Sequence, residues 1–177
     1  YRLKELQKLS QTEYITADII QVFQRDAEYR RKVLDRFCVR YYQKYAQILS
    51  KYEKVLKQKN RSLKVGSSKE LITLYNQQLS ELATPIVIDR KNALTAITSM
   101  MKDLLIESNL MDFKQINCHY ICKRMELNNE SEYREKLYEK MMKDYDNEKK
   151  CGYSLAGPQR DDFIVTIDEK SCFDMYS

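Results

Sequence analysis

The sequence predicts a mainly α-helical protein built on a long antiparallel helical hairpin, with a few β-strands toward the C-terminal end. Three observations predict this fold. Only three glycines and two prolines occur in 177 residues, so few positions break a helix. Apolar residues recur every three or four positions between residues 26 and 64, the period of one helix face. Alternating stretches at 115–124, 163–167 and 171–175 indicate strands.

The first helix is expected to run from Asp26, its N-cap, to Leu63, as one seam of about eleven turns. Such length without a helix breaker is typical of a coiled-coil-like arm. A turn at 65–68 then reverses the chain, and a short turn favours an antiparallel neighbour. We expect five seam residues to be buried against the second helix: Leu34, Tyr41, Ile48, Tyr52 and Val55.

The second helix is expected to span residue 68 to about residue 108. Ser67 and Glu70 have the spacing of a capping box that starts it. Pro85 is predicted to kink or interrupt it, because proline lacks the backbone N–H that the helix needs. Its apolar stripe is predicted to consist of Leu71, Leu74, Tyr75, Gln78 and Leu82, resuming with Ala93, Ile97, Met101, Leu104 and Leu105.

Shorter elements follow the hairpin. We expect a strand at 115–124, a charged helix at 131–148 ended by Cys151 and Gly152, and a β-hairpin that turns at 168–170. These few strands are expected to lack a sheet of their own and to pair with strands outside the chain.

The charge is unevenly distributed. The net charge is +5, but residues 25–64 hold thirteen Lys and Arg against four Asp and Glu, a local balance of +9. Such a helix fits binding to a phosphate backbone, and equally a solvated helix face. No apolar run approaches the ~18 residues of a membrane span, so a cytoplasmic location is expected.

The cysteines and motifs exclude several activities. Five cysteines without a secretory signal indicate reduced thiols. Cys118, His119 and Cys122 invite a zinc interpretation, but structural zinc usually needs four ligands, so no metal site is expected. The sequence has no Gly-x4-Gly-Lys-Ser/Thr phosphate-binding loop, so the chain alone is not expected to bind ATP. Asp161 and Asp162 are interpreted as part of a structural ion pair beside Arg160 rather than as metal ligands.

Four segments, at residues 30–35, 45–64, 75–90 and 157–163, resemble in their order the RecF family of bacterial ABC/SMC-type ATPases that work on DNA. Residues 30–35 are similar to the stretch that opens the RecF arm, and residues 157–163 to its Gly-Pro-His/Gln-Arg-Asp-Asp segment. Residues 75–79 resemble its Trp-Asp-x-Gln-Leu, followed by an Arg at position 90. A spaced pattern matches at Tyr45, Leu49, Tyr52, Leu56, Gln58, Asn60 and Lys64. Tyr14 and Asp18-Ile19 match a further motif, from which Thr16 and Ala17 depart, so the role of residues 1–25 stays open.

This resemblance implies that the chain is the middle of a larger protein. Residues 1–25 would form the edge of an ABC-type ATPase head, which would also own the strands, and residues 26–110 the helical arm. Residues 111–150 would supply a strand and a charged helix, and residues 151–177 would lead to the signature motif. Ser177 falls about where the signature Ser would stand, so Ser177, Arg160 and Asp161 are the residues expected near the nucleotide. ATP and Mg²⁺ would bind the whole protein, and no catalytic residue is expected in this chain.

The resemblance also implies partners. The whole protein would form an ATP-dependent homodimer and act with recombination mediator proteins in replication, recombinational repair and the SOS response. It would bind duplex, gapped or junction DNA without sequence specificity. The predicted DNA contacts are Arg30, Arg31, Lys32, Arg40, Lys44 and Lys51. Two alternatives stay open. One is another SMC-like ATPase, with residues 21–24 in a nucleotide-sensing loop, and the other is a non-enzymatic helical scaffold or adaptor.

Overall fold

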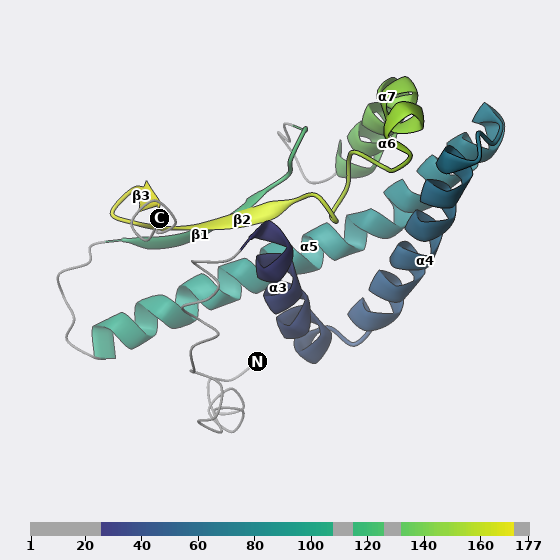
Figure 1. Ribbon diagram of the computed structural model, residues 1–177. Coiled ribbons are helices and arrows are strands. Elements are labelled where there is room, and N and C mark those ends of the chain that lie inside the picture. Colours follow the sequence, from purple (N-terminus) through teal and green to yellow (C-terminus); the bar gives the residue numbers. More distant parts are fainter. Residues whose placement is uncertain (1–25, 108–114, 126–131, 172–177) are drawn as a thin grey trace.

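The computed structural model describes residues 26–107, 115–125 and 132–171. This part is mainly α-helical with one small sheet, which confirms the predicted fold class (Figure 1). Its helices are α3 (Ala27–Tyr41), α4 (Tyr45–Lys64), α5 (Lys69–Glu107), α6 (Tyr133–Lys143) and α7 (Tyr145–Cys151). Its strands are β1 (Ile116–Ile121), β2 (Asp162–Ile167) and β3 (Lys170–Ser171). None of the described helices is both long and apolar enough to cross a membrane.

Helices α4 and α5 form the predicted antiparallel pair (Figure 1). The turn between them is a Schellman motif, in which Ser67 N–H donates to Ser62 O at 3.0 Å and Gly66 N–H to Leu63 O at 3.3 Å. Gly66 has a φ of +71°, a left-handed conformation that a side chain disfavours. The next helix is capped by Ser68, whose Oγ accepts the N–H of Leu71 at 3.4 Å. The prediction that Ser67 caps it is therefore wrong by one residue.

The single helix predicted for 26–63 is in fact two helices. The backbone of Tyr42 is extended, with φ −116° and ψ 110°, and it separates α3 from α4. This break lets α3 and α4 pack on α5 along different directions (Figure 1). Leu34 and Tyr52 are buried as predicted, and Ile48 and Val55 are half-buried. The prediction for Tyr41 is wrong. It lies at the end of α3, is 38% exposed, and packs on Phe37 with ring centroids 4.3 Å apart.

Helix α5 runs without interruption through Pro85 for 39 residues. The predicted interruption is wrong because one missing N–H is outweighed by packing on α4, α6 and β1, which hold the helix along much of its length. The predicted apolar stripe is also wrong at four positions, since Leu71, Leu74, Gln78 and Leu104 are exposed. The buried apolar side chains of α5 are those of Ile72, Leu79, Ala83, Ile86, Val87, Ala93 and Leu94.

The strands pair with one another, contrary to the expectation that they lack a sheet of their own. Within the described residues they form one antiparallel sheet in the order β1-β2-β3, with Ile116 opposite Ile167 and Ile121 opposite Asp162. The β2–β3 turn uses two residues with positive φ, Asp168 at 47° and Glu169 at 65°, as a type I′ hairpin requires. Cys118 N–H donates to Thr98 Oγ1 at 3.2 Å and so joins β1 to α5.

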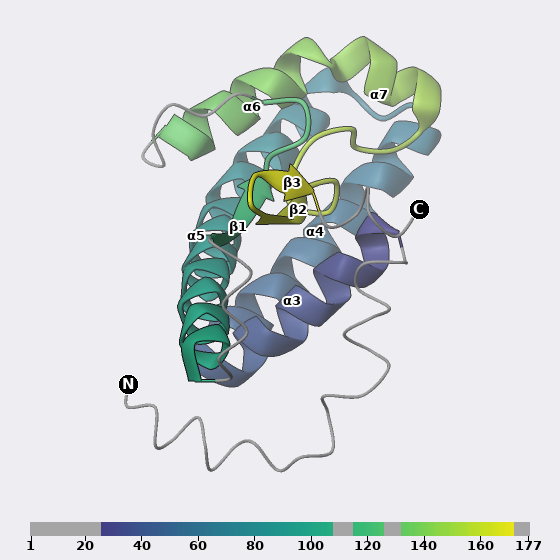
Figure 2. The same ribbon diagram turned by 90° about the vertical axis from the view of Figure 1, so that its left-hand side faces the viewer.

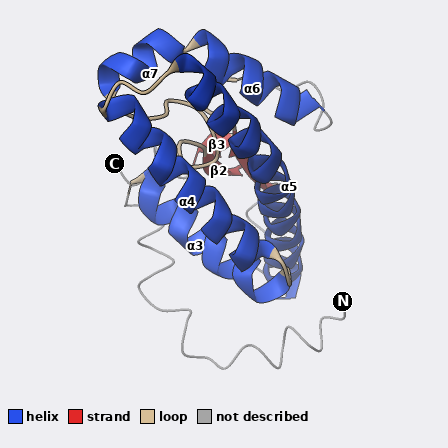
Figure 3. Ribbon diagram, turned by 90° about the vertical axis from the view of Figure 1, so that its right-hand side faces the viewer, coloured by secondary structure: helices blue, strands red, loops and turns tan. Residues whose placement is uncertain are grey.

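The charged segment between β1 and β2 forms two helices rather than one, since Asp144 separates α6 from α7. Gly152 ends α7 as predicted, with a left-handed φ of 75°. Figures 2 and 3 show α6 and α7 covering one end of the α4–α5 pair, with the sheet lying along α5. Leu137 and Met141 of α6 complete a hydrophobic core with α5, and Phe163 and Val165 of β2 extend it.

Candidate functional site

The segment Gly157–Asp162 connects the α7 end of the molecule to β2, and most of it is buried. Gly157 has a φ of +121°, which only glycine adopts readily. A Cβ at this position would lie 2.5 Å from Tyr52 Oη and 2.7 Å from Gln159 Oε1. Tyr52 donates its hydroxyl to Gln159 Oε1, and Gln159 Nε2 donates to Ala156 O at 2.9 Å. The segment is therefore fixed to α4 by its backbone conformation and by side-chain hydrogen bonds.

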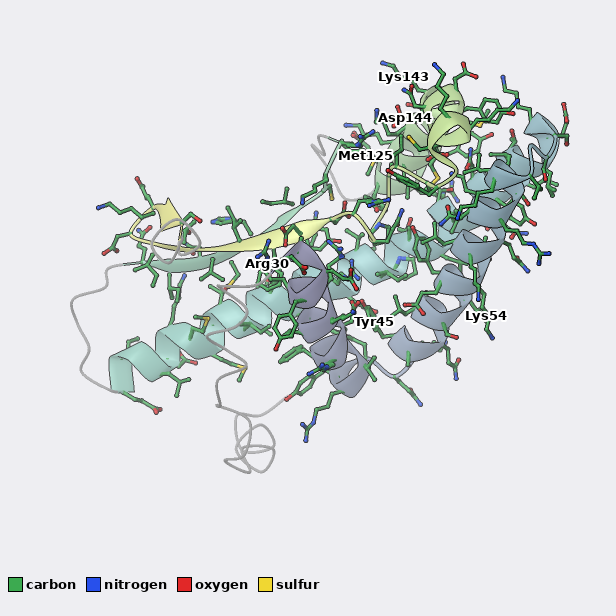
Figure 4. The ribbon with its side chains drawn as sticks, in the orientation of Figure 1. Arg30, Tyr45, Lys54, Met125, Lys143 and Asp144 are labelled. Atoms are coloured by element: carbon green, nitrogen blue, oxygen red, sulfur yellow. The ribbon has the colours of Figure 1, made fainter. Side chains whose placement is uncertain are left out.

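Arg90 of α5 lies at the centre of a buried polar network. Its guanidinium makes a bidentate ion pair with Asp35 of α3, with Nε–Oδ1 at 2.8 Å and Nη2–Oδ2 at 2.9 Å. It also donates to Pro158 O at 2.7 Å and to Tyr120 Oη at 3.2 Å. Tyr45, at the start of α4 (Figure 4), donates its hydroxyl to Asp35 as well. One side chain thus joins three helices, β1 and the Gly157–Asp162 segment.

Asp161 is fully buried at the edge of this network. Its Oδ2 accepts the hydroxyl of Tyr120 at 3.0 Å, and its Oδ1 accepts the N–H of Lys123 at 3.0 Å. Burial raises the pKa of Asp161 to about 7, although these hydrogen bonds and Arg90 act to lower it. The Asp161 carboxyl is therefore a proton-binding group near neutral pH that connects to Arg90 through Tyr120.

Asp162 binds the start of α3. Arg30 makes a bidentate pair with it, with Nε–Oδ1 at 2.9 Å and Nη2–Oδ2 at 2.7 Å, and Figure 4 shows Arg30 next to β2. Burial by itself would raise the pKa of Asp162, but the hydrogen bonds and charge of Arg30 bring it below its ordinary value. Arg31 Nη1 donates to Asp161 O at 2.7 Å. Asp162 thus lies in a structural ion pair as interpreted, although its partners are Arg30 and, at 3.8 Å, Lys123, and not Arg160.

A second buried pair joins α4 to α7. Lys59 Nζ lies 2.6 Å from Glu148 Oε2 and donates to Ser154 Oγ at 3.0 Å, and the Lys59 and Glu148 side chains are both fully buried. Burial lowers the pKa of Lys59. Asn60, the next residue of α4, accepts the N–H of Ser154 at 2.8 Å. Sequence reasoning missed this pair, yet a lysine among the apolar seam positions was the available signal of a buried partner.

The three residues predicted near the nucleotide differ in their surroundings. Arg160 is exposed, and its guanidinium lies over the Tyr153 ring at 4.8 Å from the centroid. It borders an open hollow of about 340 Å³ between α3, α4 and the Gly157–Asp162 segment, which Arg31, Lys32 and Glu53 also line. Asp161 is buried behind this surface, and Ser177 lies outside the described residues.

The six predicted DNA contacts fall into two groups. Arg30 and Arg31 are partly buried and bind Asp162 and Asp161 O, so the fold already uses both. Lys32, Arg40, Lys44 and Lys51 are exposed, and Lys32 pairs with Glu28 at 2.6 Å. Exposed ion pairs of this kind contribute little to stability, which leaves Lys32 available to a stronger anion.

The cysteines and the single histidine do not converge on a metal site. Cys38, Cys118, Cys122 and Cys151 are free thiols in the described part of the chain, whereas Cys172 lies outside it. Burial raises the pKa of Cys122 to about 12, so its thiolate is scarce at neutral pH. No cluster of three or more His, Cys, Asp or Glu suited to a metal ion occurs among residues 26–107, 115–125 and 132–171.

Comparisons with known proteins agree on one family. The chain is 30% identical over 155 residues to the DNA replication and repair protein RecF of Clostridium novyi (strain NT), covering 84% of the chain and 40% of that protein. It is 24% identical over 170 residues to RecF of Clostridium tetani (strain Massachusetts / E88), covering 94% of the chain and 46% of that protein. The chain thus spans less than half the length of these curated relatives. No protein-family model matches it.

A solved structure shares the fold. The structure of the recombination mediator protein RecF-ATPrS in the RecFOR pathway superposes with a TM-score of 0.80 at 25% identity, over 91% of this chain and 44% of that one. The helical hairpin, the small sheet and the buried connecting segment therefore have the arrangement of part of a RecF structure. In sequence and in fold, the chain is similar to less than half of a RecF protein.

The residues that carry the family resemblance are largely those of the buried polar networks. Tyr45, Tyr52, Asn60, Arg90 and the Gly157–Asp162 segment all take part in them. These residues lie up to 117 positions apart in the chain and are brought together only by the fold. Asn60 belongs to the network of Lys59 and Glu148, whereas the others surround Arg90 and form what we call the clasp, which holds the arm helices and the Gly157–Asp162 segment together.

Proposed function

We propose that this chain forms the arm and adjoining lobe of a RecF-like DNA-binding ATPase that acts in DNA replication and recombinational repair. The observation that carries the proposal is the shared fold over about nine tenths of the chain, together with the ordered sequence matches. The arm length also supports a RecF-like protein over another SMC-like ATPase, because the hairpin turns at Gly66, after only 20 residues of α4.

In this proposal the nucleotide is bound by the whole protein. ATP with Mg²⁺ would lie between the heads of an ATP-dependent homodimer. Arg160 and Asp161 would lie on the signature side of that site, and Ser177 would start the signature motif. The support is the clasp, since Arg90, Tyr52 and Arg31 hold the Gly157–Asp162 segment rigidly on the arm. A change of nucleotide state at the segment would therefore move the arm with it.

The DNA-binding surface would use exposed cations at the base of the hairpin: Lys32, Arg40, Lys44 and Lys51. Lysine and arginine on a helix face contact phosphates without reading bases, which fits binding that is independent of sequence. Arg30 and Arg31 contribute through the fold instead, because both are hydrogen-bonded to the Asp161–Asp162 backbone or side chain.

The experiment is a salt titration of DNA binding by the protein encoded by the complete open reading frame, in the presence of ATP. The variant Arg40→Gln/Lys44→Gln/Lys51→Gln removes three charges from exposed positions. Its log–log slope of affinity against salt should fall by roughly 0.9 for each phosphate that no longer meets a cation. The matched control Lys102→Gln/Lys143→Gln/Lys170→Gln removes three exposed charges elsewhere and should keep the wild-type slope. A wild-type protein that binds no DNA with ATP would refute the proposal.

A further inference from the structure

The outer flank of α4 carries a row of cations that is separate from the predicted DNA contacts. Lys54, Lys57, Arg61 and Lys64 follow one another at spacings of three, four and three residues, so they lie on one helix face. All four are exposed. Figure 4 shows Lys54 on the side of α4 that faces away from α5.

These cations are not neutralised by nearby acids. None of the four forms an ion pair with a carboxylate in the part of the chain that the structure describes, whereas Lys32, Lys136 and Lys140 each have one. Glu53 is the single acidic residue in the sequence of α4. The positive potential along this flank is therefore available to an external anion.

The flank is hollowed and held rigid. A shallow hollow of about 470 Å³ is lined by Lys57, Arg61 and Lys64 together with Glu53, Leu56 and Asn60. The buried Lys59–Glu148 pair fixes α7 against the same stretch of α4. Helix α7, which contacts α4, carries two further exposed lysines, Lys149 and Lys150. The Lys64 side chain lies close over Gly152, where an added Cβ would come 3.0 Å from Lys64 Cγ.

We propose that this flank is a second phosphate-binding surface, which continues the contact at Lys44 and Lys51 toward the tip of the hairpin and binds duplex DNA. The inference rests on the proposed function. From Lys54 to Lys64 the row is about 15 Å long, or about 5 Å per charge, at the rise of an α-helix. A strand of B-DNA advances about 3.4 Å per phosphate along the axis, so the row is about as long as a run of five phosphates. The flank thus lengthens the duplex footprint without adding base recognition.

The test uses the complete protein with ATP and a fluorescent duplex of mixed sequence, with anisotropy measured against KCl concentration. The flank variant is Lys54→Gln/Lys57→Gln/Arg61→Gln, which keeps long side chains and good helix formers. The slope of log affinity against log KCl concentration should decrease in magnitude by roughly 2–3 in this variant. Its affinity at 0.1 M salt should fall by at least ~10-fold. Lys102→Gln/Lys143→Gln/Lys170→Gln is the charge-matched control, and Lys54→Arg/Lys57→Arg should keep the wild-type slope.

The outcomes separate the two proposals. If Arg40→Gln/Lys44→Gln/Lys51→Gln lowers the slope and the flank variant does not, the flank proposal is wrong and the proposed function stands. Equal losses in the flank variant and its charge-matched control would show a net-charge effect and also overturn the flank proposal. A wild-type protein without DNA binding overturns both. Melting temperatures close to wild type are expected, since the three positions are exposed, and a second flank variant, Lys57→Gln/Arg61→Gln, serves if the triple change unfolds the protein.

Discussion

At the scale of single residues, Arg90 shows how a buried charge can hold distant segments together. A guanidinium out of water needs partners for its N–H groups, and here Asp35, Tyr45, Tyr120 and Pro158 O supply them. The neighbouring acids and tyrosines raise the pKa of Arg90 well above its ordinary value, although burial alone would lower it. Arg90 therefore stays charged, and Asp35 depends on it for a counterion.

Replacing Arg90 with Met should lower the free energy of unfolding by about 3–5 kcal/mol, because Asp35 would be left without the cation that compensates its partial burial. Urea denaturation of the purified chain measures this change. Arg40→Met removes a charge from an exposed position and should change stability by less than about 0.5 kcal/mol. A loss below about 1 kcal/mol for Arg90→Met would show that the clasp is not held by this pair.

Asp161 should make stability depend on pH in a defined direction. The folded protein keeps the proton on Asp161 up to a pH of about 7, whereas the unfolded chain releases it near pH 4. The folded state thus binds more protons between these values, and the free energy of unfolding falls as the pH rises through that window. Asn can replace the carboxylic acid, with its oxygen accepting from Lys123 N–H and its amide donating to Tyr120 Oη.

The variant Asp161→Asn should therefore gain stability relative to wild type as the pH rises from 5 to 8. The relative gain should be on the order of 2 kcal/mol. Parallel urea titrations of the two proteins at several pH values give the difference directly. A difference that is constant across this range would mean that Asp161 is already ionised in the folded protein at pH 5.

At the scale of elements, substitutions at two glycines with positive φ, Gly66 and Gly157, distinguish the cost of backbone strain from the cost of a steric clash. Gly66 has no atom within 4 Å of an added Cβ, so Gly66→Ala should cost only the left-handed conformation, about 1 kcal/mol. Gly157→Ala would also force apart Tyr52 and Gln159, and should cost at least ~2 kcal/mol more. Thermal unfolding of both variants checks the order, and equal losses would contradict the tight approach of α4 to the segment.

The sequence predicted the elements better than their ends and faces. The hairpin, its turn at Gly66, the strand at 115–124 and the stop at Gly152 all follow from local signals, and all are present. No glycine or proline marks the break at Tyr42. We attribute the break to α3 and α4 packing separately on α5, which no local sequence signal reveals. Pro85 is tolerated for a similar reason, since tertiary packing outweighs one missing hydrogen bond. Such outcomes depend on packing that no local pattern contains.

The sequence predicted which residues form the candidate site but not which of them interact. The family pattern pointed to Tyr45, Tyr52, Arg90 and the Gly157–Asp162 segment, but the spacing of these residues does not say that they form one network. Arg30 and Arg31 were expected to contact DNA, because residues 25–64 carry a local charge balance of +9 and the family resemblance favours a DNA-binding role. Their acidic partners lie about 130 residues later in the chain, and only the fold brings them together.

At the scale of the whole molecule, the arrangement joins the two surfaces to which we have given proposed functions. The Gly157–Asp162 segment borders α3 and α4. Helix α4, which carries the cationic flank, runs on toward the tip of the hairpin (Figure 1). The clasp around Arg90 and the buried pair of Lys59 with Glu148 connect the helices that lie between these surfaces. We propose that the whole protein uses these connections to transmit a nucleotide-driven movement of the segment to DNA held along the arm.

The most direct test of the proposed function is to measure how duplex binding by the complete protein depends on the bound nucleotide. Anisotropy titrations of a labelled duplex would be run with ATP, with ADP and without nucleotide, at one salt concentration. If the arms close on DNA only in an ATP-bound dimer, as we propose, binding should be tight with ATP and weaker by at least ~10-fold in the other two conditions. Equal affinity in all three conditions, or no binding in any, would contradict it.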